Sequence, residues 1–432
     1  MIKKILRKCF LNKSRISRRK KFLEIIENSD SYELQKEKLE NLINFSKEKN
    51  PYYSEIFKKY LSFGNFPLLT KEIIKNNYDQ LKSTDLKRNY QYQNSSGGST
   101  GKPVTFFQDD IYNAWLEVTV EYYFKYFLSV DNIDNTKKVV LWGSERDVMN
   151  IKDLRAKFHF WLTNTVFLNT FNVTRKQWLE YIKKINSYKP LFIRGYAGSL
   201  YEIAKIIKEI NIKVHKPKFI YSAAEMLQDF MRQTIEEAFG AKVYDFYGSR
   251  EVGAIAGECS QGKKHIFIFN NLIEIFSLEN KPLEKTREGK IIVTNLHNYS
   301  MPMIRFEIGD TGIINDKMCS CGSKLPYFEK ITGRITDHFI KNDGTLVHGE
   351  YFTHLFYFKN WVQTFQVIQT NYDKIDILVE KNSPPLQNEI NDIEEKIKIV
   401  MGQDCLINWK FVDKIENNLQ GKHLFTKTLL KR

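Results

Sequence analysis

Cysteine is scarce in this chain, and long apolar runs are missing. The 432 residues contain five cysteines, which is too few for a disulfide scaffold in a chain of this length. No uninterrupted apolar stretch approaches the roughly 20 residues that span a bilayer, and the first apolar run is far too short for the core of a secretory signal. These absences argue against a secreted or membrane-spanning protein and predict a cytoplasmic one.

Two common nucleotide-binding motifs are also missing. In "NSSGGSTGKP", residues 94–103, the first glycines lie too close to Gly101-Lys102 for a Walker P-loop, and Pro103 stands where the helix would begin. The dinucleotide motif G-x-G-x-x-G does not occur. What remains is a Gly/Ser-rich loop between strand-like segments, which is either a solvated turn or a cradle for phosphate oxygens. The candidate phosphate donors are Ser95, Ser96, Ser99, Thr100 and Lys102.

The chain carries an excess of positive charge. The formal net charge is +15, and part of it lies in the acid-free start "MIKKILRKCFLNKSRISRRKKF". This segment suits a solvated basic helix, and it is also compatible with contact to anionic lipid at the inner face of a membrane or to nucleic acid. Aromatic residues are not interleaved with Lys and Arg as in a stacking platform, so no nucleic-acid partner is expected.

Hydrophobic periodicity predicts an α/β protein with two domains. Residues 20–60 form an amphipathic helix that Asn50-Pro51 breaks, Thr70 caps a further helix, and 110–128 form a long aromatic helix. Short apolar runs then alternate with helical periods, which indicates a mostly parallel sheet. From about 255 to 332 strand follows strand, which predicts an antiparallel or barrel-like subdomain. We expect a large domain over 1–334 and a small α+β domain over 335–432.

Five segments, in order, carry a family resemblance. They are "SSGGSTGKPV", "YSAAE", "DFYGSREVG", "MPMIRFEIGDTG" and "GRITDHFI". The chain resembles the phenylacetate–CoA ligase-like, CapK-type members of the adenylate-forming enzymes along nearly its whole length. The resemblance implies the fold of that superfamily: a large N-terminal domain with parallel α/β sheets and a β-rich subdomain, and a small mobile α+β lid at the C-terminus.

The resemblance also implies roles for individual residues. Glu251 would hold Mg²⁺, which prefers oxygen ligands; Asp310 would bind the ribose hydroxyls; and Arg334 would reach ribose or phosphate. Tyr247 would stack on adenine, with Asp245 or the segment 223–225 at its edge. The complete set of implied nucleotide-binding residues beyond the phosphate loop is Ala223, Ala224, Glu225, Asp245, Phe246, Tyr247, Gly248, Ser249 and Asp310.

The C-terminal domain would act as a lid. In related enzymes such a domain rotates between the two half-reactions and brings one lysine to the α-phosphate. Lys422 in "LQGKHLF" matches the family ending, and Lys427 is the alternative. The hinge departs from the family pattern, because Thr336 stands where the first Asp is expected and only Asp337 remains.

Four residues have the types and spacing of a zinc site. Cys259 and His265 form C-x5-H, and Cys319 and Cys321 form C-x-C some fifty residues later. Three thiolates and one imidazole suit tetrahedral zinc, and four protein ligands would make the site structural. C-x-C is tighter than the usual C-x2-C, so four unconnected residues are the alternative interpretation. A similar cluster in some phenylacetate–CoA ligase-like proteins favours the site.

Together these features predict an enzyme that activates a carboxylic acid with ATP and Mg²⁺ and passes the acyl group to an amine or thiol, coenzyme A included. The resemblance favours capsule or surface-polysaccharide synthesis, with a sugar uronate or a small acid as substrate. An aryl–CoA ligase of aromatic acid metabolism is the rival within the class, and a basic nucleic-acid or membrane-surface binding protein is the rival outside it. The oligomeric state stays open, a dimer included.

Overall fold

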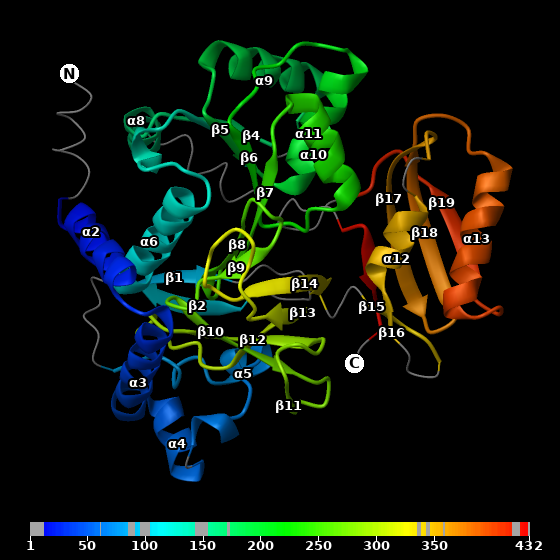
Figure 1. Ribbon diagram of the computed structural model, residues 1–432. Helices are drawn as coiled ribbons and strands as arrows, with labels where there is room; N and C mark the ends of the chain where they lie inside the picture. The colour runs from blue at the N-terminus through cyan, green and yellow to red at the C-terminus, as the bar shows by residue number, and fades with distance from the viewer. Residues whose placement is uncertain are drawn as a thin grey trace. The chain divides into compact units, whose positions relative to one another are not determined.

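The computed structural model describes residues 13–60, 62–84, 91–95, 104–142, 154–170, 173–334, 338–342, 346–356, 359–416 and 424–430 (Figure 1). Contacts divide the chain into two compact units. The first contains Met1–Ile308 and Gly312–Ile331, and the second contains Gly309–Thr311 and Thr332–Arg432. Each unit has its own hydrophobic core, and the chain passes from the first unit to the second at Thr332.

A mixed sheet forms the centre of the first unit. Among the described residues it has twelve strands, in the spatial order β11-β10-β12-β13-β14-β9-β8-β7-β6-β5-β3-β4. The strands are β3 (Lys138–Trp142), β4 (Thr165–Asn169), β5 (Phe192–Gly195), β6 (Phe219–Ala223), β7 (Val243–Ser249), β8 (Gly253–Glu258), β9 (Lys264–Ile266), β10 (Asn271–Phe276), β11 (Pro282–Leu283), β12 (Gly289–Asn295), β13 (Phe306–Asn315) and β14 (Tyr327–Arg334).

The sheet changes direction at β7. Strands β4, β3, β5, β6 and β7 are parallel neighbours, whereas β7–β8, β8–β9 and β9–β14 pair antiparallel. Of the two alternatives for 255–332, an antiparallel or a barrel-like subdomain, the structure has the antiparallel one, and its strands continue the sheet of the parallel half. The chain turns straight back after β7, so the later strands extend the same hydrogen-bonded sheet.

Helices surround this sheet, and several begin where the sequence predicts. They are α2 (Lys13–Asn28), α3 (Ser31–Lys49), α4 (Pro51–Lys59), α5 (Lys71–Asn76), α6 (Asp110–Tyr126), α8 (Leu154–Leu162), α9 (Arg175–Tyr188), α10 (Ala197–Glu209) and α11 (Asp229–Phe239), with 3-10 turns at Phe63–Asn65 and Ile133–Asn135. The Thr70 hydroxyl accepts from Ile73 N–H at 3.2 Å and caps α5. Helix 20–60 is instead two helices before Asn50, because the Asp30 carboxylate accepts from Tyr32 and Glu33 N–H and starts a new one.

Different helices cover the two faces of the parallel strands (Figure 1). The aromatic residues of α6 pack on one face, where the Phe124 ring lies 5.1 Å from that of Phe192 on β5 and 5.3 Å from that of Tyr221 on β6. Helices α10 and α11 contact β3, β6 and β7. Because side chains alternate along a strand, Phe192 and Arg194 of β5 share the α6 face, while Ile193 and Gly195 point to the other.

A separate hairpin, β1 (Gln91–Ser95) and β2 (Thr105–Asp109), pairs antiparallel with Ser95 opposite Thr105. The predicted phosphate loop therefore connects two strands, as the sequence indicates. Asp109 at the end of β2 is buried and caps α6 through Tyr112 N–H at 2.8 Å. Its other oxygen accepts from Tyr299 and Ser300 N–H, each at 2.9 Å. The hairpin is thus fixed to α6 and to the loop before β13.

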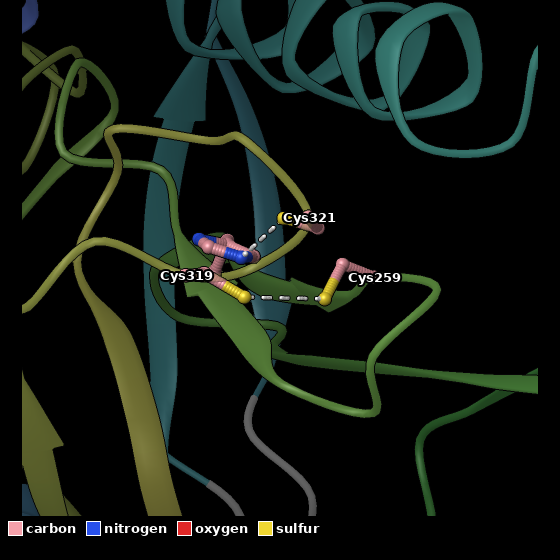
Figure 2. A group of neighbouring side chains, drawn as sticks. Cys259, Cys319 and Cys321 are labelled. Atoms are coloured by element: carbon pink, nitrogen blue, oxygen red, sulfur yellow. Dashed lines mark hydrogen bonds between the residues drawn. The ribbon is translucent and has the colours of Figure 1, made fainter.

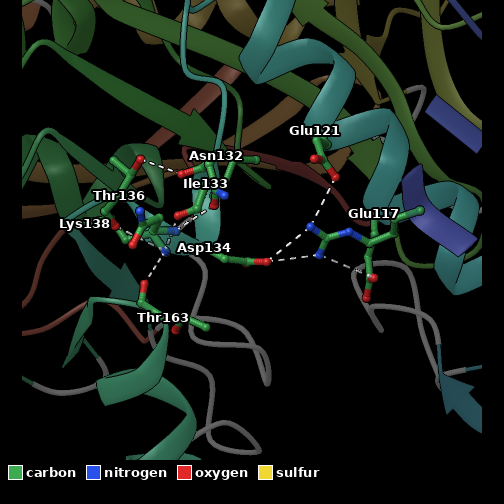
Figure 3. Close-up of polar contacts among 10 residues, drawn as sticks. Glu117, Glu121, Asn132, Ile133, Asp134, Thr136, Lys138 and Thr163 are labelled. Atoms are coloured by element: carbon green, nitrogen blue, oxygen red, sulfur yellow. Dashed lines mark hydrogen bonds and ion pairs between the residues drawn. The ribbon is translucent and has the colours of Figure 1, made fainter. Parts of the chain in front are cut away.

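Part of the basic N-terminus is neutralised within the molecule. Figure 3 shows Glu117 and Glu121 of α6 and Asp134 of the 3-10 turn converging on one guanidinium, that of Arg19 on α2, at 4.0, 3.2 and 3.2 Å. Arg18 pairs with Asp110 at 2.5 Å. These two charges hold α2 against α6, so they support the solvated-helix interpretation of this segment more than a binding one. No helix among the described residues is long and apolar enough to cross a membrane.

The second unit is a small α+β domain. Its main sheet has the order β19-β18-β17-β20, and α13 buries Ile390, Ile393 and Ile397 in the unit's core. The elements are β15 (His338–Ile340), β16 (Leu346–His348), α12 (Gly349–Leu355), β17 (Val362–Asn371), β18 (Lys374–Lys381), α13 (Gln387–Met401), β19 (Leu406–Phe411) and β20 (Thr426–Thr428).

Substitution of Gly257 should test how tightly α6 packs on β8. A Cβ atom at Gly257 would overlap the ring of Tyr123, which is fully buried and donates from its hydroxyl to the Glu258 carbonyl at 2.8 Å. Gly257→Ala should lower the free energy of unfolding by about 1–3 kcal/mol, measured by urea denaturation. Gly64→Ala is the control, because its Cβ would come no closer than 3.8 Å to the Ser62 hydroxyl. Equal stability of the two variants would contradict this packing.

Candidate functional site

The predicted nucleotide-binding segments meet at one edge of the sheet. Strands β5, β6 and β7 are parallel neighbours, so their C-terminal ends lie at the same edge, here called the carboxyl edge. The segment 223–225 follows the end of β6, and 245–249 forms the end of β7. Ligands of open parallel sheets bind outside the carboxyl ends of the strands. The structure thus brings together two segments that the sequence could only name separately.

Close backbone approach requires Gly248. The hairpin from β7 to β8 has a register shift between Tyr247 and Gly248, and a Cβ atom at Gly248 would overlap the carbonyl group of Gly253. The Ser249 hydroxyl accepts from Val252 N–H at 3.4 Å and tightens the same turn. Gly248 therefore allows the tight turn that follows Tyr247, where the sheet changes from parallel to antiparallel pairing.

Ala224 has an unusual backbone. Its φ is +70°, a left-handed conformation that costs an alanine roughly 1 kcal/mol or more. The residue is exposed and comes directly after β6. Backbone strain of this kind at the carboxyl edge is typical of a functional turn. The sequence "YSAAE" contains no glycine from which the left-handed conformation could have been predicted.

Glu225 has a structural partner. Its Oε2 accepts from the Gly198 N–H at 2.8 Å, at the start of α10, where the N-cap residue Tyr196 makes no side-chain cap bond. A carboxylate at a helix N-terminus satisfies a free N–H and interacts favourably with the helix dipole. Glu225 therefore joins β6 to the helix after β5, whatever else it contacts.

Asp245 offers an acceptor to a ligand. The side chain is 7 % exposed, and Lys264 pairs with its Oδ2 at 3.1 Å. Asp245 Oδ1 has no hydrogen-bond donor among the described residues. The same is true of the buried hydroxyl of Ser222, the residue paired with Asp245 on β6, which has no hydrogen-bond partner among the described residues. Buried polar atoms are normally satisfied. These two atoms belong to residues paired across β6 and β7, and a ligand with both donor and acceptor groups would satisfy them.

Glu251 lies in the turn after β7 and is 6 % exposed. Lys71, the first residue of α5, places its Nζ 3.7 Å from Glu251 Oε1. Gln108 of β2 donates to the neighbouring Arg250 carbonyl at 2.7 Å, so the hairpin that carries the phosphate loop is anchored at this turn. A nearly buried carboxylate next to the strand that leads out of that loop has the chemistry to hold a divalent cation.

Several predicted residues cannot be placed against this site. Ser96, Ser99, Thr100, Lys102 and Lys422 lie outside the described residues, as does the hinge pair Thr336 and Asp337. Ser95 ends β1. The remaining candidates have described backbones: Asp310 on β13 after Gly309, whose φ is +92°; Arg334 at the end of β14; and Lys427, exposed on β20.

The rings of the tyrosine motif pack in different ways. Phe246 faces the α6 side, with its ring 5.3 Å from that of Tyr123 and 5.4 Å from that of Tyr221. Tyr247 meets Phe328 of β14 edge to face at 5.7 Å and is only half-buried. Both rings are partly buried and pack against the core of the first unit, Phe246 on the α6 side and Tyr247 against β14.

The predicted metal ligands come together. Ligand atoms of Cys259, His265, Cys319 and Cys321 all lie within 4.8 Å of one another. Figure 2 shows the thiol of Cys319 facing that of Cys259; the two sulfurs are 3.9 Å apart. The Cys321 sulfur lies 3.2 Å from His265 Nε2. Tetrahedral zinc with Zn–S bonds of about 2.3 Å would separate two sulfurs by about 3.8 Å. The donor set therefore fits that ion.

Neighbouring backbone groups orient the side chains of the Cys/His cluster. His265 Nδ1 lies 2.8 Å from the Leu325 carbonyl, and donation there leaves Nε2 as the ligand atom. Burial lowers the pKa of His265 and raises that of the Cys321 thiol to about 12. Gly262 and Gly322, at φ +76° and +86°, each donate their N–H at 3.0 Å to the carbonyl of the cysteine three residues earlier, Cys259 and Cys319. The two cysteine turns therefore have the same shape.

Comparison with solved structures identifies the fold. 2-Hydroxyisobutyryl-CoA ligase, in its postadenylation state in complex with 2-HIB-AMP, superposes with a TM-score of 0.71 at 16% identity, over 91% of this chain and 88% of that one. The chain therefore has the fold of the adenylate-forming ligases.

Sequence comparison narrows the class. "Protein CapK" of Staphylococcus aureus is 27% identical over 92% of this chain and 89% of its own length. The CapK C-terminal domain family matches residues 339–428. Phenylacetate-coenzyme A ligase of Thermus thermophilus is 23% identical over 36% of this chain and 37% of its own. The chain is thus similar to CapK along nearly its whole length, and its C-terminal part matches the CapK C-terminal domain family, in agreement with the resemblance recognised from its motifs.

Loss of the Glu225 carboxylate should loosen the start of α10. Glu225→Ala removes the acceptor of the Gly198 N–H and should lower the free energy of unfolding by about 0.5–2 kcal/mol in urea denaturation. Glu225→Gln keeps a side-chain oxygen and should recover most of the loss. Equal losses in the two variants would show that this hydrogen bond does not stabilise the helix.

Proposed function

We propose that the protein uses ATP and Mg²⁺ to convert a carboxylic acid into an acyl-adenylate, and then transfers the acyl group to an amine or thiol acceptor. The observation that carries this proposal is the convergence of 223–225, 245–249 and the nearly buried Glu251 at one edge of the sheet. The family relationship supports the same reaction class. Coenzyme A and an amine remain the two acceptors to be tested.

In the proposed first half-reaction, a carboxylate oxygen attacks the α-phosphorus of ATP, and the bond to pyrophosphate breaks. Charge stays on phosphate oxygens throughout, so catalysis depends on positioning and electrostatic stabilisation. Tyr247 would stack on adenine, and the unpartnered Oδ1 of Asp245 would accept from a donor on the base edge. Asp310 would bind ribose, and Arg334 ribose or phosphate.

Glu251 would hold Mg²⁺, which supplies positive charge to the phosphates when bound. Lys71 places its Nζ 3.7 Å from the same carboxylate and partly compensates its charge. The phosphate loop, with Ser96, Ser99, Thr100 and Lys102, would contact the β- and γ-phosphates. Lys422 is the proposed lid lysine, and Lys427 its alternative.

The relationship to CapK supports a further assignment to capsule or surface-polysaccharide synthesis, with a sugar uronate or another small acid as substrate. Phenylacetate-type aryl–CoA ligase activity is the alternative. We propose zinc for the Cys/His cluster, where it would join β8, β9 and the connection between β13 and β14 and so stabilise the sheet. Contact of the basic N-terminus with a membrane stays a prediction.

A pyrophosphate exchange assay with a panel of acids tests the adenylation step and separates the two lysines. Glu251→Gln and Lys422→Ala should each reduce exchange by roughly 10²–10³-fold, as loss of one preorganised charged group does. Lys422→Ala should still transfer the acyl group from a supplied acyl-adenylate, because that step uses the rotated lid.

Lys396→Ala is the matched control in the second unit, because Lys396 is exposed and pairs with Asp392 of its own helix at 2.8 Å. If Lys427→Ala abolishes exchange and Lys422→Ala does not, the lid lysine is misassigned. If none of the acids in a broad panel supports pyrophosphate exchange by the wild-type protein, the proposed reaction is wrong.

Metal analysis tests the zinc proposal. Purified protein should contain about one zinc per chain, as one four-ligand site requires. Cys319→Ser should lose that metal and melt at a lower temperature, because metal binding contributes to folding. Cys405→Ser is the matched control, since Cys405 is also buried but lies in the core of the second unit. Unchanged metal content in Cys319→Ser would refute the site.

A further inference from the structure

Arg194 occupies an unusual place near the carboxyl edge. It is the second-last residue of β5, on the face covered by α6, and lies opposite Val140 of β3 and Tyr221 of β6. Its guanidinium carbon lies 4.8 Å from the ring centre of Trp142 and 5.3 Å from that of Tyr221. Trp142 in turn packs on Tyr196 at 4.1 Å. Aromatic faces therefore hold the cation in one position.

The guanidinium has no hydrogen-bonding partner in the described part of the chain. Arginine carries five N–H donors, but Arg194 makes no hydrogen bond or ion pair with any described residue, and its Nε is buried and unpartnered there. Other partly buried arginines of the first unit are paired. Arg232 contacts Glu258 at 2.7 Å, and Arg305 contacts Glu274 at 2.5 Å.

Neutral rings compensate the charge of the partly buried Arg194 only in part. A cation–π contact is worth about 0.5–2 kcal/mol, whereas desolvation of an unpaired charge costs more. Burial also raises the pKa of Tyr221, so this neighbour stays neutral and supplies no counter-charge. An arginine fixed by aromatic side chains, with its donors unused, is a preformed receptor for an anion.

We propose that Arg194 binds a second anionic group of the acid substrate, so that the enzyme selects acids with a negative charge at the end remote from the reacting carboxylate. This inference rests on the proposed adenylation function and names the substrate class for it. Trp142 and Tyr221 position the guanidinium, and Arg194 is the specificity-determining residue.

The strand order explains why Arg194 meets the remote end of the acid. β6 lies between β5, which carries Arg194 on the α6 face, and β7, which carries Asp245 and Tyr247 on the opposite face, so a ligand that reaches both passes around the carboxyl edge. Two strand spacings amount to about 10 Å. With adenine at β7, the reacting carboxylate lies near the α-phosphate. This position is too far from β5 for Arg194 to bind the same carboxylate. A small acid with anionic groups at both ends spans this separation.

Matched acids provide the test. Glutarate and adipate are compared with pentanoate and hexanoate, which have the same chain lengths and one carboxylate fewer, in the pyrophosphate exchange assay. Wild-type protein should favour the dicarboxylates in kcat/KM by roughly 10- to 100-fold, the contribution of a hydrogen-bonded charge pair. Arg194→Met should bring that ratio close to one, and Arg194→Lys should restore part of it.

Arg175→Met is the control variant, because Arg175 is exposed on α9 and pairs with Glu209 at 2.8 Å; it should keep the wild-type ratio. A wild-type ratio near one, or an unchanged ratio in Arg194→Met, overturns the proposal and leaves the adenylation function standing.

A chemical-protection experiment tests binding of the acid at Arg194 independently of catalysis. Phenylglyoxal modifies accessible guanidinium groups, and mass spectrometry of peptides reports Arg194 and Arg175 separately. Glutarate or adipate should protect Arg194 more than the matched monocarboxylate does, and neither should protect Arg175. Equal protection, or none, overturns the proposal even if no acid supports exchange, whereas selective protection without exchange would support the receptor and refute only the adenylation function.

Discussion

The buried carboxylate of Asp109 is the constraint on which the surroundings of the site depend. It caps α6, and it accepts hydrogen bonds from Tyr299, Ser300 and Tyr112. Burial raises the pKa of Asp109, while these hydrogen bonds act in the opposite direction. Because a buried charge without partners is strongly unfavourable, the hairpin, the helix and the loop before β13 can adopt only a joint arrangement that supplies all the donors.

From that arrangement follows the layout of the site. With α6 fixed, its aromatic side chains cover one face of β5–β7 and leave the carboxyl edge to short, polar or strained segments. Gln108 of the hairpin donates to the Arg250 carbonyl and so ties β2 to the turn that holds Glu251. Charged groups then divide by position: acids stand where a base, a ribose or a cation would bind, and Arg194 stands on the side where the acid would lie. The two acids are each paired with a lysine, Asp245 with Lys264 and Glu251 with Lys71, whereas Arg194 has no acidic partner among the described residues.

Local signals predicted much of this. The Thr70 cap, the break at Asn50-Pro51, and the alternation of apolar runs with helical periods depend on neighbours in sequence, and they appear in the structure. The Cys/His cluster was also predictable, because residue type alone limits its partners. Helix α8 and strand β4 went unrecognised. So did the continuity of the sheet beyond β7, the contact of Lys71 with Glu251, and the aromatic surroundings of Arg194. Each of these depends on which distant segments pack together, and no short motif encodes that.

The pairing of β9 with β14 has a consequence for how the chain assembles. Most neighbouring strands of the parallel half follow one another closely in sequence, but β9 must wait for a partner that begins at Tyr327. Non-local contacts of this kind slow folding, because the entropy of closing the loop is lost before the contact forms. The cluster of Cys259 and Cys319, 60 positions apart, lies at this closure. An ion held there would keep the closed loop from reopening, and the half-formed sheet would be exposed for a shorter time during synthesis of the protein.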